Sequence, residues 1–385
     1  MLHPGRRGRR LRVLPAPDQP DQLGRREVAT VGGATGRRRR RRLVLCLIAL
    51  FVVLNTGLEA YLRRNLPTTT QPFTPSPARQ ELARRYFPQT YWVFIPGFGI
   101  DYCPDVERAY GDMISDTGQS FCVAPSPVAL DPNEIAGAVR ARVDRGRGGP
   151  DTPVTLRFYG ISMGGMIAYD VARLLRERDP SIAVDAIVFD SSPAGPASVS
   201  GIKQLGPRWG GLLNRTPNLP LGIPNPLKGG PLNRTAVHLA EALVGNLRNG
   251  RFPLAADDVR FAWYKATRVS GDGVANQLAY IDSFYPLSWP AADDAVRFAY
   301  FRAEDPTADT TVDVRHAEQT YRRLIAPHEL WVYPVPQGGH ASADTTIPGY
   351  RATMRAFLSD ARIPTVEDLR REALRVSRRN IPVGP

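Results

Sequence analysis

Lysine, histidine and cysteine are scarce in this chain of 385 residues, which contains three lysines, five histidines and three cysteines. No cysteines have the CxxC spacing of a structural zinc site, so no metal centre is expected. Cys103 and Cys122 are the only pair in the part of the chain that follows the long apolar run. They form a disulfide if that part faces an oxidising compartment, or remain two reduced, buried thiols.

Net positive charge outside the N-terminal end is also small, although the formal net charge of the chain is +13. Residues 1–42 hold 13 arginines and three acidic residues, a net of +10, so the remaining 343 residues carry only about +3. A nucleic-acid-binding domain would concentrate its basic residues on the folded part. We therefore expect no nucleic-acid partner, and we interpret residues 1–42 as a disordered basic tail in the cytoplasm.

A long apolar run follows six consecutive arginines that end at Arg42. As a helix, residues 43–62 reach about 30 Å, enough to cross a bilayer, with Glu59 and Tyr61 near the far interface. The arginines hold their end in the cytoplasm by the positive-inside rule. The run predicts a single-pass signal anchor with the rest of the chain outside the cytoplasm. A cleaved signal peptide that releases a secreted protein is the alternative.

The remainder of the chain has a changing pattern. Residues 63–79 are rich in proline and threonine and predict an extended linker. Residues 80–361 alternate short apolar runs with amphipathic helical patterns, which predicts an α/β fold with a mostly parallel, doubly wound sheet. The runs that read as strands are 90–99, 121–127, 153–160, 184–193, 295–306 and 329–336.

The alternation stops over residues 194–290, which are rich in Pro, Gly and Asn. Helical patches occur at 235–248 and 256–268, and nothing between them reads as a strand. We interpret 194–290 as a helical cap inserted over one edge of the sheet. Residues 362–385 predict a basic helical tail.

The stretch "FYGISMGGM" (158–166) places a serine between glycines where a strand turns into a helix. The pattern G-x-S-x-G is met by Gly160, Ser162 and Gly164. A serine at such a turn projects above the sheet, and glycines are needed where helix and strand pass closely. Ser162 is therefore the candidate nucleophile.

A serine hydroxyl needs a base, and the position of His340 favours it over the other histidines. His340 follows the last predicted strand and a Gly-Gly pair, at the carboxyl edge of the sheet where active-site groups collect. The other histidines lie in the basic tail, in helical patterns or in a surface turn: His3, His238, His316 and His328.

A carboxylate must orient the base and stabilise the imidazolium. Asp305 comes directly after the strand at 295–302 and is the best placed. Asp309, in the same loop, is the alternative if the loop curls, and Asp190, at the end of the preceding strand, is a third option. Two backbone N–H groups are expected to form an oxyanion hole: that of Met163 and that of Phe98 in "IPGFG", where Gly97 allows a sharp turn.

These motifs together resemble the α/β-hydrolase superfamily of serine esterases and lipases over residues 90–360. The resemblance rests on "PGFG", "GISMGG", "AEDP" and "GGH" occurring in this order. It implies that Ser162 is the nucleophile, His340 the general base and acid, Asp305 the orienting acid, and Phe98 and Met163 the oxyanion donors. It also places 194–290 where the family carries its lid. Pro96 replaces the frequent His-Gly of the oxyanion loop, and the linker leaves no room for the two strands that often precede it.

The sequence thus predicts a membrane-anchored serine hydrolase that cleaves carboxylic esters, with lipid or acyl esters favoured. No metal or organic cofactor is expected, and the substrate is a small-molecule or lipid ester. Two alternatives stay open: an acyltransferase that uses the same acyl-enzyme, and a non-catalytic binding module on the hydrolase fold.

Overall fold

The computed structural model describes residues 32–73, 77–99, 103–149, 151–200, 205–218, 225, 228–248, 254–290, 296–343 and 346–379. The chain divides into two compact units, Met1–Leu50 and Phe51–Pro385. The first described helix, α1, runs over Gly32–Asn65. Among the described residues, one helix, Arg39–Asn65 within α1, is long and apolar enough to cross a membrane.

The second unit is built on a seven-stranded sheet with the order β1-β3-β2-β4-β5-β6-β7. All neighbouring strands pair in parallel except β1, which pairs antiparallel with β3 at one edge. The strands are β1 Gln71–Phe73, β2 Thr90–Ile95, β3 Gln119–Ala124, β4 Val154–Ile161, β5 Ile182–Asp190, β6 Arg297–Ala303 and β7 Leu330–Val335. The predicted mostly parallel sheet is confirmed.

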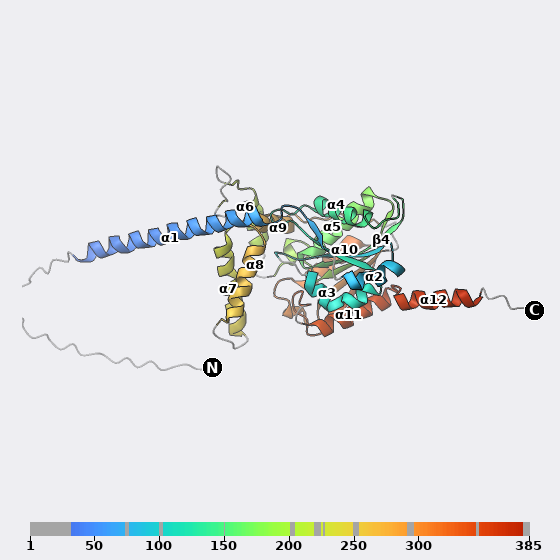
Figure 1. Ribbon diagram of the computed structural model, residues 1–385. Helices are drawn as coiled ribbons and strands as arrows, with labels where there is room; N and C mark the ends of the chain where they lie inside the picture. The colour runs from blue at the N-terminus through green and yellow to red at the C-terminus, as the bar shows by residue number, and fades with distance from the viewer. Residues whose placement is uncertain are drawn as a thin grey trace, which may run out of the picture. The chain divides into compact units, whose positions relative to one another are not determined.

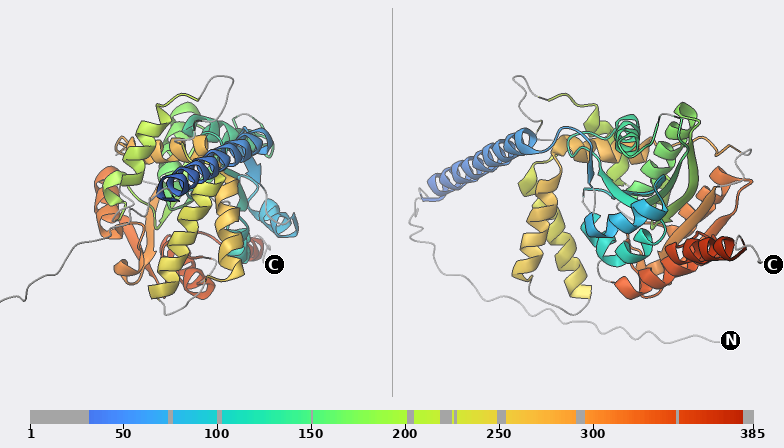
Figure 2. Two further views of the ribbon diagram at one scale, coloured as in Figure 1. Left: turned by 90° about the vertical axis from the view of Figure 1, so that its left-hand side faces the viewer. Right: turned by 45° about the vertical axis from the view of Figure 1, so that its right-hand side comes forward.

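Helices cover both faces of this sheet (Figures 1 and 2), as the right-handed crossovers between parallel strands require. One buried cluster joins the strands to α4, α5 and α10, and a second joins them to α3 and α11. These helices are α3 Cys103–Ser115, α4 Pro132–Asp144, α5 Met163–Arg178, α10 Val314–Ile325 and α11 Ile347–Asp360. A further helix, α12 (Val366–Arg379), follows near the C-terminal end.

The interior strand β2 shows why its sequence "TYWVFI" forms a doubly covered strand. Tyr91, Val93 and Ile95 belong to the first cluster, whereas Trp92 and Phe94 belong to the second. Side chains along a strand point to opposite faces in turn, so an uninterrupted run of large apolar residues buries both faces.

The insertion at 194–290 is mainly helical over its described residues. It contains α6 Leu205–Asn214, α7 Pro231–Arg248, α8 Ala256–Arg268 and α9 Gly271–Asp282. The two patches expected from the sequence, 235–248 and 256–268, fall within α7 and α8. The helices α6 and α9 were not expected, because their glycines and prolines obscure the helical pattern.

The segment 63–79 is not the extended linker that its composition suggested. It contains the end of α1, the edge strand β1 and the start of α2 (Pro77–Tyr86). The β1 strand pairs with β3 from Gln71 opposite Ala124 to Phe73 opposite Cys122. A proline is tolerated in β1 because an edge strand has one side free of ladder bonds. The sheet therefore does have one strand before the predicted oxyanion-loop strand.

Cys122 lies in β3 and is disulfide-bonded. The side chain of Cys103, its expected partner, lies outside the described residues.

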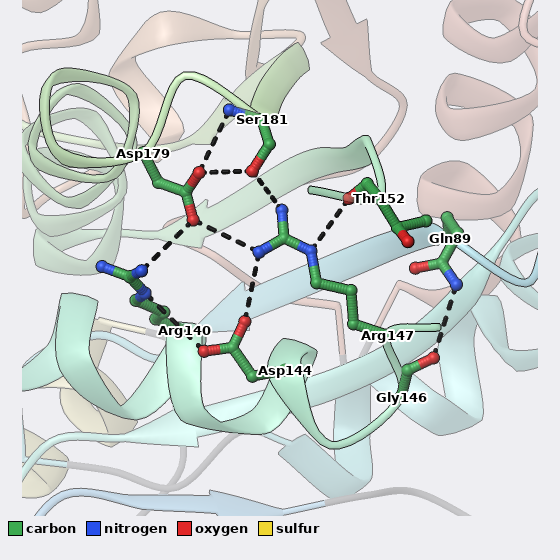
Figure 3. A network of polar contacts seen from close by, with 8 residues as sticks. All are labelled: Gln89, Arg140, Asp144, Gly146, Arg147, Thr152, Asp179 and Ser181. Atoms are coloured by element: carbon green, nitrogen blue, oxygen red, sulfur yellow. Dashed lines mark hydrogen bonds and ion pairs between the residues drawn. The ribbon is translucent and has the colours of Figure 1, made fainter. Parts of the chain in front are cut away.

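A polar network ties together the loops at the amino ends of β4 and β5, away from the carboxyl edge of the sheet (Figure 3). Arg147 is its centre: its guanidinium lies 3.3 Å from both Asp144 and Asp179 and donates to the Thr152 carbonyl oxygen at 2.9 Å. The Arg147 side chain is only 4% exposed, so its charge is compensated almost entirely by these partners. The network fixes the end of the sheet that carries no candidate catalytic residue.

Candidate active site

Ser162 lies on the turn between β4 and α5, as the sequence predicted. Its φ of 51° is in the left-handed region that residues with a side chain rarely adopt. The Ser162 N–H donates to the carbonyl oxygen of Asp190 at 2.8 Å, which ties the turn to the neighbouring strand β5. A strained conformation held this way is typical of a serine presented for attack.

Glycines on both sides of the serine allow close packing of strand and helix. A Cβ on Gly160 would collide with the backbone of the first turn of α5. A Cβ on Gly164 would collide with the carbonyl oxygens of Ile95 and Pro96 at the end of β2. The G-x-S-x-G pattern is therefore a packing requirement of this turn, independent of any chemistry.

His340 lies in the loop after β7, and its ring reaches the serine. The His340 Nε2 atom is 3.0 Å from Ser162 Oγ, and its Nδ1 atom is 3.0 Å from Asp309 Oδ2. With the proton on Nδ1, the ring donates to the carboxylate and accepts from the serine hydroxyl. The two residues that the sequence assigned as nucleophile and base are thus brought together.

The acidic partner of His340 is Asp309, the alternative acid of the sequence analysis, and not Asp305. The Asp309 side chain is fully buried, and its Oδ1 atom accepts from the N–H groups of Thr311 and Val312 at 2.9 Å each. Its second oxygen remains for the imidazole. These three donors orient the carboxylate.

Asp305 is exposed and has a local structural role. Its carboxylate accepts from the Thr307 N–H and hydroxyl at 2.8 Å each and caps a short 3₁₀ turn, η5 (Pro306–Ala308). These hydrogen bonds lower the Asp305 pKa from its ordinary value. The 3₁₀ turn carries the chain from β6 to Asp309, which is how the loop curls.

Asp190, the third option, is buried at the end of β5 and bonds to tyrosines. Tyr159 donates to it at 2.9 Å and Tyr350 at 3.1 Å. Burial raises the pKa of Asp190 to about 7, against the opposing effect of the two hydroxyl donors. The Tyr350 hydroxyl also accepts from the N–H of Ser342, two residues after His340. Asp190 therefore supports the loop that holds the candidate base.

The sequence gave no signal for this support. Tyr350 and Tyr159 lie on a helix and a strand, where a buried aromatic side chain ordinarily indicates only core. Both hydroxyls become visible as part of the site once the fold places them against one carboxyl group.

The two segments that carry the expected oxyanion donors both adjoin Ser162. Met163 follows it at the first position of α5, and the loop "PGF" after β2 packs directly against it. A Cβ on Gly97 would lie 3.0 Å from the carbonyl oxygen of Ile161 and 3.1 Å from Ser162 Cβ, so only glycine fits without displacement. The N–H of Gly99, one residue after Phe98, donates to Gln277 Oε1 of α9 at 3.1 Å. The cap thus holds the loop that carries Phe98, a contact the sequence did not indicate.

Within the part of the chain that the structure describes, no group of three His, Cys, Asp or Glu side chains is arranged to hold a metal ion. The arrangement can instead relay a proton from a serine hydroxyl to an imidazole that a buried carboxylate orients.

Comparison with known proteins finds similar solved structures at low sequence identity. No family model and no curated protein matches the sequence. Among solved structures, an α/β hydrolase family protein from Desulfitobacterium hafniense is similar at 14% identity and a TM-score of 0.41, covering 75% of this chain and 100% of that one. An α/β hydrolase fold protein from Burkholderia ambifaria is similar at 13% identity and a TM-score of 0.40, covering 74% and 92%. A type II thioesterase from the yersiniabactin pathway is similar at 15% identity and a TM-score of 0.40, covering 76% and 97%.

Proposed function

We propose that this chain, which has the α/β-hydrolase fold, is a serine hydrolase that cleaves carboxylic esters through an acyl-enzyme on Ser162. His340 is the general base and acid, Asp309 the orienting carboxylate, and the N–H groups of Phe98 and Met163 the oxyanion donors. The catalytic domain is residues 80–361, extended by β1 and the start of α2, with the cap at 194–290.

The observation that carries this proposal is the continuous chain of contacts from Ser162 Oγ through His340 to Asp309, each 3.0 Å long. The three residues are far apart in the sequence, and a purely structural role does not explain why a strained serine faces a half-buried imidazole. Hydrogen-bond reach between nucleophile and base, with the base oriented by a third group, is the geometric signature of nucleophilic catalysis.

The reaction follows from this geometry. His340 Nε2 takes the proton as Ser162 Oγ attacks the ester carbonyl, and the oxyanion accepts hydrogen bonds from the two backbone donors. The imidazolium, stabilised by Asp309, then protonates the leaving alcohol, and the acyl group remains on the serine. Water attacks this acyl-enzyme with His340 again as base, which releases the acid and restores the serine.

We also propose that α1 is an uncleaved signal anchor with its N-terminus in the cytoplasm. The arginine block before the apolar run supports the orientation. Retention is supported by Asn55 and Glu59, which follow the apolar run and are each only 4% exposed because they are bonded to the cap. Cleavage beyond residue 59 would remove both of these partners of the cap. A secreted form remains the alternative that protein sequencing of the mature N-terminus would reveal.

Labelling with a fluorophosphonate probe tests the catalytic proposal. The parent chain should be labelled and Ser162→Ala should not, while Ser359→Ala, a change at an exposed serine on α11, should label like the parent. Labelling of Ser162→Ala at the parent's rate would refute the assignment of the nucleophile. Product analysis of a short-chain ester with and without an acceptor alcohol then separates hydrolysis from acyl transfer. Labelling without any turnover would favour a binding module.

A further inference from the structure

The last turns of α1 carry a polar stripe that is seated on the cap. Asn55, Glu59 and Arg63 are four residues apart and therefore lie on one face of the helix. Asn55 Oδ1 accepts from the N–H of Leu232 at 3.0 Å, and Arg63 pairs with Asp272 at 2.8 Å. All of these residues belong to the second unit, Phe51–Pro385.

Glu59 makes the most buried of these contacts. Its carboxylate accepts from the Gly271 N–H at 2.5 Å and pairs with Arg234 at 3.0 Å, with 5% and 11% of the two charged side chains exposed. Gly271 is the first residue of α9, and Leu232 lies in the first turn of α7. Asn55 and Glu59 therefore accept hydrogen bonds from the N-terminal ends of α7 and α9, two helices of the cap. The Glu59 carboxylate lies at the positive end of the α9 dipole.

The fit between α1 and the cap is close. A Cβ on Gly230, just before α7, would collide with the side chain of Asn55. The apolar run of α1 ends at Leu54, so the first residue after it is already buried in the cap. A bilayer that contains the apolar run would therefore end at the cap.

The helices α7 and α8 expose several large apolar side chains. Within the second unit they run across the direction of the last turns of α1 (Figures 1 and 2). Val237, Val244 and Leu247 of α7 are spaced to share one face of the helix and are 49–57% exposed. On α8 the exposed large apolar residues are Val259, Phe261, Trp263 and Tyr264, at 38–55%; by their spacing, Val259 and Trp263 lie on one side of the helix and Phe261 and Tyr264 on the other. We use the name apolar cap face for these seven exposed residues together.

Cations accompany two of the aromatic rings of this face. The Lys265 ammonium lies 4.4 Å from the ring centroid of Phe261, and the Arg268 guanidinium lies 4.2 Å from that of Tyr264. Apolar and aromatic side chains flanked by Lys and Arg are typical of helices that lie in the headgroup region of a membrane. Scattered single apolar residues would need no explanation, but a group on two adjoining helices does.

We propose that the apolar cap face rests on the lipid bilayer that holds α1, and that the ester substrate is a lipid taken from this bilayer. The second clause rests on the proposed hydrolase function, whereas the first does not. The occupant is lipid because the cap is joined without a spacer to the end of the apolar run, so the face is held within reach of the headgroups. A helix that lies on the membrane in this way buries its apolar side and keeps its cations among the phosphates.

Quenching of tryptophan fluorescence tests the contact directly. The full chain is placed in nanodiscs of phosphatidylcholine with or without brominated acyl chains, at one chain per disc. The share of the signal due to Trp263 is found by difference from Trp263→Phe, and Trp331→Phe on the core strand β7 is the control. Quenching of the Trp263 share, and not of the Trp331 share, is expected. Absence of quenching of Trp263 fluorescence would overturn the proposal. If Trp263 is shielded from the brominated lipid only when each disc holds two chains, the face would be assigned to contact with a second copy.

Enzymatic assay tests the substrate clause. Val244→Asp combined with Phe261→Asp should lower hydrolysis of a bilayer-borne lipid ester by about tenfold or more and leave a soluble short-chain ester within about twofold. Leu374→Asp places one such charge at an exposed leucine of α12 and should change neither rate. Equal loss on both esters, with normal fluorophosphonate labelling, would overturn the lipid substrate. If the parent hydrolyses no ester, the hydrolase proposal fails, while the quenching result still decides the membrane contact.

Discussion

The buried carboxyl group of Asp190 should make the stability of the fold depend on pH in a direction opposite to that of most carboxylates. Burial raises its pKa from 3.8 to about 7 in the folded protein, despite hydrogen bonds from Tyr159 and Tyr350. The folded state therefore binds this proton more tightly than the unfolded chain. The resulting penalty is absent below about pH 4, grows as the pH rises, and is complete above about pH 7.

The magnitude follows from the shift. A difference of about three pH units corresponds to a penalty of about 4 kcal/mol in the free energy of unfolding above pH 7. At pH 5 only about 2 kcal/mol of it is present, so the parent should lose about 2–3 kcal/mol from this group between pH 5 and pH 8. For a domain of this size that loss lowers the melting temperature by roughly 5 °C.

Asp190→Asn isolates this effect, because the amide is neutral at both pH values and still offers one acceptor and donors to the two tyrosines. In nanodiscs, the variant should have a higher melting temperature than the parent at pH 8. This difference in melting temperature should be smaller by roughly 5 °C at pH 5. Asp360→Asn is the matched control, since Asp360 is exposed and also accepts from a tyrosine, Tyr333, at 3.0 Å. If the gap between Asp190→Asn and the parent is the same at both pH values, Asp190 is already ionised at pH 5 and the reasoning is wrong.

Three further predictions concern the site and its support. Asp309→Asn should lower kcat for a soluble ester by roughly 10³–10⁴-fold, because the imidazole loses its orienting carboxylate, whereas Asp305→Asn should stay within about twofold; equal effects would contradict the assignment of the acid. Gly97→Ala should lower kcat by at least about tenfold while fluorophosphonate labelling slows in parallel, because a Cβ there displaces the oxyanion loop from the serine; unchanged labelling would count against that loop. Arg147→Ala should destabilise the fold by about 2–3 kcal/mol in thermal or urea unfolding, since it removes a guanidinium that is 4% exposed and paired with Asp144 and Asp179, whereas Arg140→Ala, at a half-exposed arginine that pairs with the same two carboxylates, should cost about 1 kcal/mol or less.

The sequence was sufficient to predict the sheet, the turn that carries Ser162 and the loop that carries His340. These features are local: a strand, a glycine-flanked turn and a strand end can each be recognised within about ten residues. The sequence did not determine which carboxylate orients His340. Asp305 and Asp309 lie in one loop, and only a 3₁₀ turn, whose formation depends on the cap that Asp305 itself provides, decides which one faces the imidazole.

The features that the sequence missed are long-range. Gln71–Phe73 has only three residues, one of them a proline, so its sequence does not indicate a strand. It forms one because β3 presents an open edge with which it pairs. Glu59 appeared only as a tolerated charge near a membrane interface. Its pairing with Arg234, across 175 positions of the chain, cannot be read from either segment alone.

That separation has a consequence for how the protein is made. The partners of Glu59 are synthesised 175 and 212 residues after it, so the carboxylate leaves the ribosome long before either one exists. If α1 is the anchor proposed above, the uncompensated carboxylate would keep the turn around residue 59 out of the hydrocarbon until Arg234 and Gly271 are made. Under that proposal, the depth of α1 in the bilayer would be set before Glu59 pairs with Arg234.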